Sequence, residues 1–201
     1  MVRSIMVTGH RPGKLGGYTV NPIASRIRRE LHDIMARTRH RFGSCVGITG
    51  LAQGVDQWFA EVCRALSIPY IGYIPFPGQE RLWPSDAQDH YRQLVAEASE
   101  VHIGPSAGTK PEVIAALHRR NSEMVSTCHA AIAVWNGSAG GTVEPPMRSE
   151  NSRTSAGHSF GWTHASLSIP LLSIRGSINW RASPQLPGII FHDPQPSSSH
   201  Q

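Results

Sequence analysis

The chain has 201 residues, of which 39% are hydrophobic and 16% are charged, and we expect one domain with a real core. Its 19 Lys and Arg against 14 Asp and Glu give a net charge of +5, which favours anionic ligands without by itself indicating nucleic acid. Three cysteines without a Cys-x-x-Cys pair argue against a disulfide framework and a zinc site. No apolar run is long enough to cross a membrane, and the first apolar run is too short for a signal peptide. We therefore expect a cytoplasmic protein with no membrane partner.

The first element that the pattern predicts is a buried strand at Ile5–Thr8, which ends at Gly9. A loop rich in Gly and Pro follows, and apolar residues then recur at three and four positions over Pro22–Arg39, which predicts an amphipathic helix. Asn21 before Pro22 is typical of a helix start, with an N-cap residue and a first-turn proline.

The same alternation continues along the chain. Cys45–Thr49 predicts a second buried strand, the Gly-containing turn Gly50–Gly54 follows it, and a helix extends from Val55 to about Leu66. Pro69–Ile74 predicts a third strand, which is closed by prolines.

The next elements complete the regular part of the pattern. We expect a helix that is capped by Ser85 and reaches about Ser99, followed by a short strand at Val101–Ile103. A helix that opens at Pro111 continues through Met124, and Ala130–Trp135 is a fully apolar fifth strand.

The C-terminal part departs from this pattern. Residues 145–161 lack apolar periodicity where a helix is expected, so they predict an irregular insertion, either a long loop or a connection to a short, late helix. Leu167–Ile174 predicts a last strand, which ends a domain over residues 1–175. Residues 176–201 form a partly disordered C-terminal extension whose apolar residues are expected to pack on the sheet edge or on a partner subunit, as in a homo-oligomer.

Strands that are apolar on both faces and alternate with helices indicate a parallel sheet covered on both sides. We therefore expect an α/β fold, a Rossmann-like three-layer sandwich with a mostly parallel central sheet. Ligands bind such sheets at the carboxyl ends of the strands.

The turn Gly140-Gly141-Thr142 follows the fifth strand and is the first candidate for phosphate binding, because its N–H groups and the expected helix start would face an anion. The alternative is a tight connection in which glycine only supplies a positive φ. Glu144 is the carboxylate beside this turn, and it would act as a general acid or base or favour the helix N-terminus.

Other residues at the same edge have both functional and structural interpretations. Arg11 would contact a phosphate or pair with a helix, and Arg120 would reach over the edge toward the ligand or lie in solvent. Asp56 would bind a ribose hydroxyl or cap its helix. The ligand-binding residues that we expect are Gly9, His10, Arg11, Gly50, Leu51, Gly54, Asp56, Arg120, Asn121, Trp135, Gly137, Gly140, Gly141 and Thr142.

Two further classes of site receive less support. No histidine pair has the helical spacing of a metal site beside a third ligand, so we expect no metal and no cofactor. Six arginines between Arg26 and Arg41 lie on one helix and its exit, and we interpret them as a solvated helix face rather than as a nucleic-acid surface.

Three of these segments, in this order, resemble the SLOG superfamily. Thr8–Pro12 resembles the opening motif of its YpsA/YspA-like branch, and Gly50–Asp56 resembles the Ser-Gly-x-Ala-x-Gly-Ile-Asp segment of DNA processing protein A. The third segment runs from Leu117–Asn121 to Ala131–Gly137 and ends in Gly140-Gly141-Thr142. The resemblance covers residues 1 to about 142 and the strand at Ile169–Ile174.

The resemblance implies a Rossmann-like binder of nucleotides or their derivatives. One related branch, the "lonely guy" phosphoribohydrolases, uses an arginine that Arg120 matches and a glutamate whose position falls on Pro145, one residue after Glu144. The shortened glycine spacing also departs from that branch. Other SLOG domains sense ADP-ribose-derived signals in anti-phage defence, which implies a sensor or a sequestering protein.

We therefore expect a binder of a phosphate-bearing nucleotide-like ligand, possessing no catalytic pair. The first alternative is an enzyme that cleaves an N-glycosidic bond, with Arg120 and Glu144 as its catalytic residues. The second is single-stranded DNA binding of the DNA processing protein A kind, through the basic helix around Arg26 to Arg41.

Overall fold

The computed structural model describes residues 2–135 and 188–191. In this part of the chain a six-stranded sheet is flanked by four α-helices and one short 3₁₀ helix, η1. The strands are β1 (Arg3–Gly9), β2 (Cys45–Thr49), β3 (Tyr70–Ile74), β4 (Glu100–Ile103), β5 (Ala130–Trp135) and β6 (Gly188–Phe191). The helices are η1 (Pro12–Lys14), α1 (Pro22–Phe42), α2 (Val55–Ala65), α3 (Ser85–Glu97) and α4 (Lys110–Thr127).

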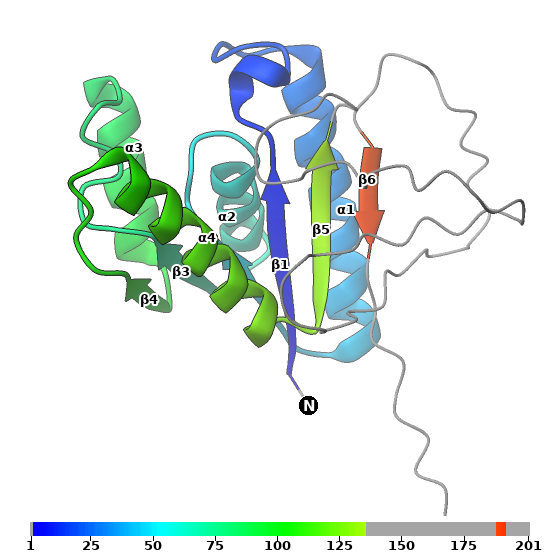
Figure 1. The fold of residues 1–201 in the computed structure, drawn as a ribbon. Helices are drawn as coiled ribbons and strands as arrows, with labels where there is room; N and C mark the ends of the chain where they lie inside the picture. Colours follow the sequence, from blue (N-terminus) through cyan, green and yellow to red (C-terminus); the bar gives the residue numbers. More distant parts are fainter. Residues whose placement is uncertain (1, 136–187, 192–201) are drawn as a thin grey trace, which may run out of the picture.

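The strand order is β4-β3-β2-β1-β5-β6, and the first five strands are parallel (Figure 1). β6 pairs with β5 in the antiparallel direction. The chain builds the sheet outward from β1 to β4 and then returns to the other side of β1 with β5. This reversal makes the β1/β5 boundary the topological switch point, where such folds bind ligands. The predicted α/β, Rossmann-like fold is confirmed.

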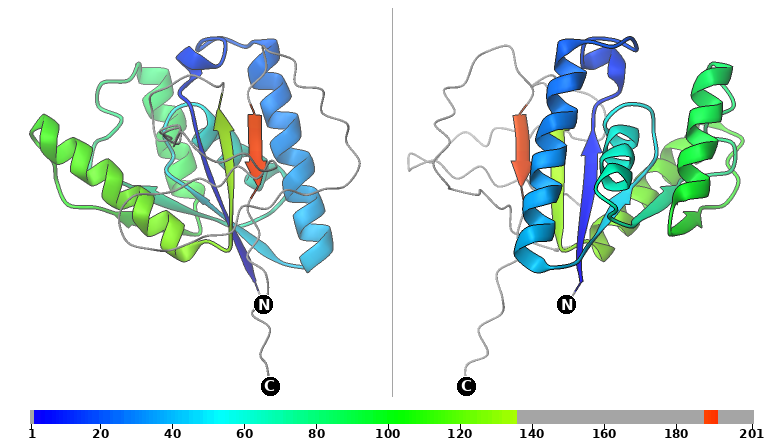
Figure 2. Two further views of the ribbon diagram at one scale, coloured as in Figure 1. Left: turned by 45° about the vertical axis from the view of Figure 1, so that its right-hand side comes forward. Right: turned by 180° about the vertical axis from the view of Figure 1, so that it is seen from behind.

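The reversal also decides which face each helix covers. Three successive right-handed crossovers in one direction place α1, α2 and α3 on one face, and the return to β5 places α4 on the other. α2 packs on β1, β2 and β3, with α1 beside it, whereas α4 contacts β1 and β3 from the opposite side (Figures 1 and 2). Two helices that lie on opposite faces therefore approach each other only at the edge of the sheet.

α1 begins as its sequence predicts, and α4 begins at Lys110, one residue before the expected start, with a cap that was not predicted. The Asn21 side chain accepts a hydrogen bond from the Ala24 N–H at 2.9 Å and caps α1, with proline in the first turn. Thr109 and Glu112 form a reciprocal capping box at the start of α4.

The predicted cap of α3 is wrong. Ser85 is the first helical residue, and Pro84 precedes it in the extended N-cap position with no side-chain cap. Pro84 has a φ of −55°, which a helix permits, but an extended ψ of 152°, so it lies outside the helix. The helix therefore begins at Ser85 itself, one residue earlier than a cap at Ser85 would give.

The C-terminal predictions are only partly within reach of the structure. The expected strand at Leu167–Ile174 and the insertion at 145–161 lie outside the described residues. Within the expected extension, Gly188–Phe191 lies beside β5 at the edge of the sheet (Figure 1).

Two hydrophobic clusters fix the layers. The larger one joins α1, α2 and α3 to the sheet and includes Val7, Leu31, Phe59 and Leu94, each no more than 1% exposed. The smaller one lies under α4 and consists of Met6, Ile48, Tyr73 and Met124. Within residues 2–135 and 188–191, no helix has the length and apolarity that a membrane crossing needs.

Candidate functional site

The carboxyl ends of the parallel strands β1, β2, β3 and β5 lie along one edge of the sheet, and Figure 1 shows those of β1 and β5 pointing to the top of the view. Gly9 is the last residue of β1, and the buried His10 follows it. The His10 backbone N–H donates to the Val134 carbonyl at 3.2 Å, so the β1 turn is attached to the end of β5. Arg11 comes next and is exposed at this edge. The switch point thus carries a cationic side chain.

Gly54 connects the turn after β2 to the turn after β1. Its φ of +101° suits glycine, and a Cβ atom there would lie 2.9 Å from Pro12 Cδ and 3.0 Å from the His10 carbonyl oxygen. The two turns are therefore in backbone contact at the position that holds Arg11. Through this contact the turn after β2 fixes the position of the turn after β1.

A buried ion pair crosses the edge of the sheet above the end of β2. Arg120 comes from α4 on one face and Asp56 from the first turn of α2 on the other, and their Nη1 and Oδ2 atoms are 3.8 Å apart. Both side chains are about one-tenth exposed or less. Arg120 also donates from Nη1 to the Gly50 carbonyl at 3.3 Å and from Nε to Asn121 Oδ1 at 2.9 Å.

Gly50 is the position over which this arginine passes. A Cβ atom at Gly50 would overlap the Arg120 guanidinium and lie 2.8 Å from Asp56 Oδ2. The absence of a side chain at the end of β2 therefore permits two helices on opposite faces to be joined by one ion pair.

Burial shifts the pKa values of the two groups in opposite directions. Burial raises the pKa of the Asp56 carboxyl, while the positive charges of Arg120 and Arg11 and hydrogen bonds from the backbone of Ala52 and Gly50 act to lower it. Burial likewise lowers the pKa of the Arg120 guanidinium, and the Asp56 charge opposes this. The pair is thus a desolvated, internally compensated group rather than an exposed acid or base.

Several backbone N–H groups of the turn after β2 form hydrogen bonds within the protein. The Asp56 carboxylate interacts with the backbone N–H groups of Gly50 and Ala52, and the Leu51 N–H donates to Thr49 Oγ1 at 3.2 Å. Leu51 itself has a positive φ of 53° and a fully buried side chain. These contacts make the turn a rigid platform beneath the edge.

The loop after β3 adds residues that the sequence interpretation did not assign to the site. The Arg11 guanidinium lies 5.8 Å from the ring centroid of Trp83, and Trp83 meets Tyr91 edge-on at 5.4 Å. Gln79 Nε2 donates to the Gly50 carbonyl at 3.4 Å and to the Tyr91 hydroxyl at 3.2 Å. A signal was present in the sequence, because this loop also follows a parallel strand and so had to reach the same edge.

The structure brings together seven of the expected residues at the carboxyl edge, and the other expected residues are placed differently or lie outside the described residues. Asn121 reaches the group only through Arg120, and Leu51 belongs to the core. Trp135 ends β5 at this edge. Gly137, Gly140, Gly141, Thr142 and Glu144 lie outside the described residues. The residues brought together are Gly9, His10, Arg11, Gly50, Gly54, Asp56 and Arg120.

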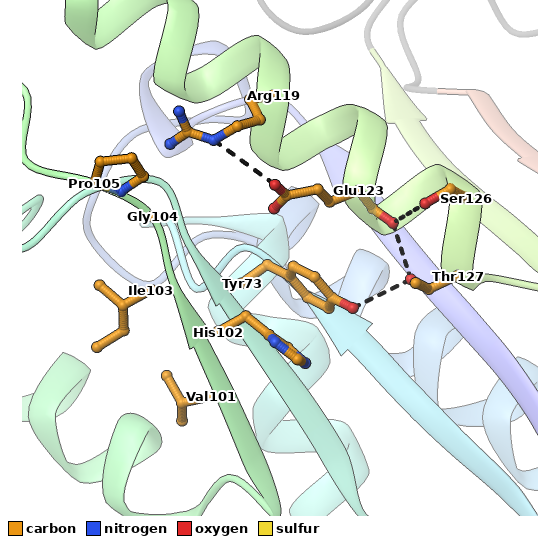
Figure 3. A pocket seen from close by; sticks show the side chains of 10 residues that line it. All are labelled: Tyr73, Val101, His102, Ile103, Gly104, Pro105, Arg119, Glu123, Ser126 and Thr127. Atoms are coloured by element: carbon orange, nitrogen blue, oxygen red, sulfur yellow. Dashed lines mark hydrogen bonds and ion pairs between the residues drawn. The ribbon is translucent and has the colours of Figure 1, made fainter.

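A hollow in the described part of the chain lies elsewhere. It has a volume of about 670 Å³ and is formed by β3, β4 and α4, and none of the predicted site residues lines it (Figure 3). Its polar side chains bond to one another, with Arg119 Nε 3.7 Å from Glu123 Oε1 and the Tyr73 hydroxyl 3.3 Å from Thr127 Oγ1. We assign the site to the carboxyl edge, because the residues that converge there come from four separate segments.

Three of the six arginines on the basic face of α1 and its exit have contacts within the protein. Arg28 pairs with Glu61 and lies 5.3 Å from the Trp58 ring centroid, and Arg39 donates to the Leu66 carbonyl. Arg26 lies 3.8 Å from Glu30 one helical turn away. These contacts favour the interpretation of a solvated helix face. Within the described residues, no group of three His, Cys, Asp or Glu side chains is suited to a metal ion.

Comparison with known proteins gives one family. The YspA SLOG family model matches residues 5–154. A UPF0398 protein of Brevibacillus brevis is 30% identical over 51% of this chain and 57% of its own length. The SPbeta prophage-derived protein YoqJ of Bacillus subtilis is 27% identical over 61% of this chain and 79% of its own length. A UPF0398 protein of Lysinibacillus sphaericus is 30% identical over 48% of this chain and 56% of its own length. The chain thus spans little more than half the length of the two UPF0398 proteins.

Proposed function

The chain belongs to the YspA SLOG family, and from this premise we propose that it binds a nucleotide-derived, phosphate-bearing small ligand at the carboxyl edge. An ADP-ribose-type molecule fits this description. The protein would bind such a molecule in order to sense it or to sequester it. The ligand would lie between the ends of β1 and β5, above the turn after β2.

The observation that carries this proposal is the position of Arg11. It is exposed, it is the second residue after β1, and it stands at the switch point of a doubly wound sheet. A guanidinium there can form two parallel hydrogen bonds with a phosphate. The neighbouring turn is held rigid by the Asp56–Arg120 pair, so Arg11 is presented from a fixed base.

The burial of Arg120 favours ligand binding over the phosphoribohydrolase alternative. In the phosphoribohydrolase alternative this arginine would stabilise the ribosyl phosphate, yet its side chain is 8% exposed and engaged with Asp56 and Gly50. Ligand contact would require it to leave a buried carboxylate, which is strongly unfavourable.

Isothermal titration with a panel of AMP, ADP-ribose and NAD tests the proposal. We expect at least one member to bind, and we expect Arg11→Ala to weaken that binding about 10- to 100-fold, because a charged hydrogen-bond donor to phosphate is lost. Arg37→Ala is the matched control, since it removes the same charge from an exposed position on α1, and it should change the affinity about twofold or less.

Three outcomes contradict the proposal. One is no binding of any panel member by the wild type, and another is equal affinity loss in the Arg11 and Arg37 variants. The third is release of free base from AMP, detected by chromatography. That result would support the hydrolase alternative instead.

A further inference from the structure

The loop between β3 and α3 presents an aromatic ring at the same edge as Arg11. Trp83 is half-buried, and it packs against the main core cluster on one side. Tyr91, which is 4% exposed, meets its ring edge-on, and the Arg11 guanidinium lies 5.8 Å from the ring centroid. A flat aromatic surface and a cation are thus adjacent beside the switch point.

The backbone that carries the ring is held by hydrogen bonds. The backbone N–H of Trp83 donates to the Glu80 carbonyl at 2.8 Å, and Gln88 Nε2 donates to the Trp83 backbone carbonyl at 2.9 Å. Gln79 attaches the start of the same loop to the Gly50 carbonyl and to the Tyr91 hydroxyl. The loop is therefore bonded to both the β2 turn and α3, which fixes the backbone from which Trp83 projects.

We propose that Trp83 is the specificity-determining residue that stacks on the base of the ligand, which lies between the indole ring and the Arg11 guanidinium. Nucleobases stack on both aromatic rings and guanidinium planes. A base between two planes needs contacts of about 3.5 Å on each side, or about 7 Å in all. Arg11, whose Cζ lies 5.8 Å from the ring centroid, therefore has to move outward by at least about 1 Å, and it is exposed and able to do so. This inference rests on the proposed function.

The inference predicts that the ligand must carry a base, not only a phosphate. A sugar phosphate without a base would keep its contact with Arg11 and lose the contact with Trp83. The experiment therefore compares AMP with ribose 5-phosphate on the full chain by isothermal titration. We expect the wild type to bind AMP about 5- to 100-fold more tightly than ribose 5-phosphate, which is the range that stacking of one base supports.

Variants at position 83 separate stacking from folding. Trp83→Leu keeps an apolar side chain beside Tyr91 but removes the flat ring, and it should bring the AMP to ribose 5-phosphate affinity ratio close to one. Trp83→Phe keeps a smaller ring and should retain most of the ratio. Leu82→Ala, at a neighbouring position that is 98% exposed, should leave the ratio unchanged. Thermal unfolding of each variant identifies any loss of the folded state.

The outcomes distinguish this inference from the proposed function. If the wild type binds both ligands and the Leu variant retains the wild-type ratio, the role of Trp83 is overturned while phosphate binding stands. If the wild type binds neither ligand, the role of Trp83 is overturned, and the proposed function is overturned with it only when ADP-ribose and NAD also fail to bind. A Leu variant that loses the ratio while its affinity for ribose 5-phosphate is unchanged supports the stacking role, and so does a Phe variant that keeps the ratio.

Discussion

Replacement of Arg120 by alanine is expected to lower the free energy of unfolding by about 3–5 kcal/mol, because it leaves the Asp56 carboxylate buried without its cation. The substitution also leaves the Gly50 carbonyl without its guanidinium donor and separates two helices that meet only at the edge of the sheet. Urea unfolding followed by circular dichroism measures the change. The ion pair is therefore a structural clamp whose loss should affect the whole domain, not only the site.

The neighbouring Arg119 provides a matched control. It is on the same helix, has a side chain that is 40% exposed and contacts Glu123 and the Pro75 carbonyl, so Arg119→Ala should cost about 1 kcal/mol or less. Adding Asp56→Asn to the Arg120→Ala variant removes the buried charge and should recover part of the stability. Equal destabilisation by the two arginine substitutions would contradict the clamp.

Replacement of Gly54 by alanine is expected to destabilise the protein by about 2–4 kcal/mol, from backbone strain at a φ of +101° together with the collision of the new Cβ with Pro12 and the His10 carbonyl. The collision displaces the segment that carries Arg11, so ligand affinity should fall as well. Urea unfolding and nucleotide titration measure the two effects.

Gly17 isolates the contribution of the collision. Its φ is also +101°, but a Cβ atom there would have no atom within 4 Å, so Gly17→Ala should cost only the backbone strain, about 1–2 kcal/mol. A Gly54 variant no less stable than the Gly17 variant would show that the contact between the two turns is unimportant.

The sequence predicted the parallel sheet because its strands are short, apolar on both faces and separated by periodic helices. The end of β5 at Trp135 and the capped start of α1 at Asn21 follow directly from such local patterns. The cap of α3 was predicted wrongly because Ser85 is already the first helical residue, and the extended Pro84 before it takes the N-cap position without a side-chain cap.

The candidate site was only partly predictable, because its central pair depends on topology. Asp56 and Arg120 are 64 positions apart, and nothing near either residue indicates that the other is its partner. Their contact arises because α2 and α4 lie on opposite faces and both reach the end of β2. The same holds for Trp83, which approaches Arg11 only once β3 is placed in the sheet.

The most direct test of the central claim is a titration of the ¹⁵N-labelled protein with the AMP, ADP-ribose or NAD ligand of highest affinity, followed by two-dimensional amide spectra. We expect the largest shifts at His10 and Arg11 and in the loop around Trp83, the segments that meet at the carboxyl edge beside the switch point. Shifts concentrated instead at Tyr73, His102 and Thr127, in the hollow beside α4, would contradict the account.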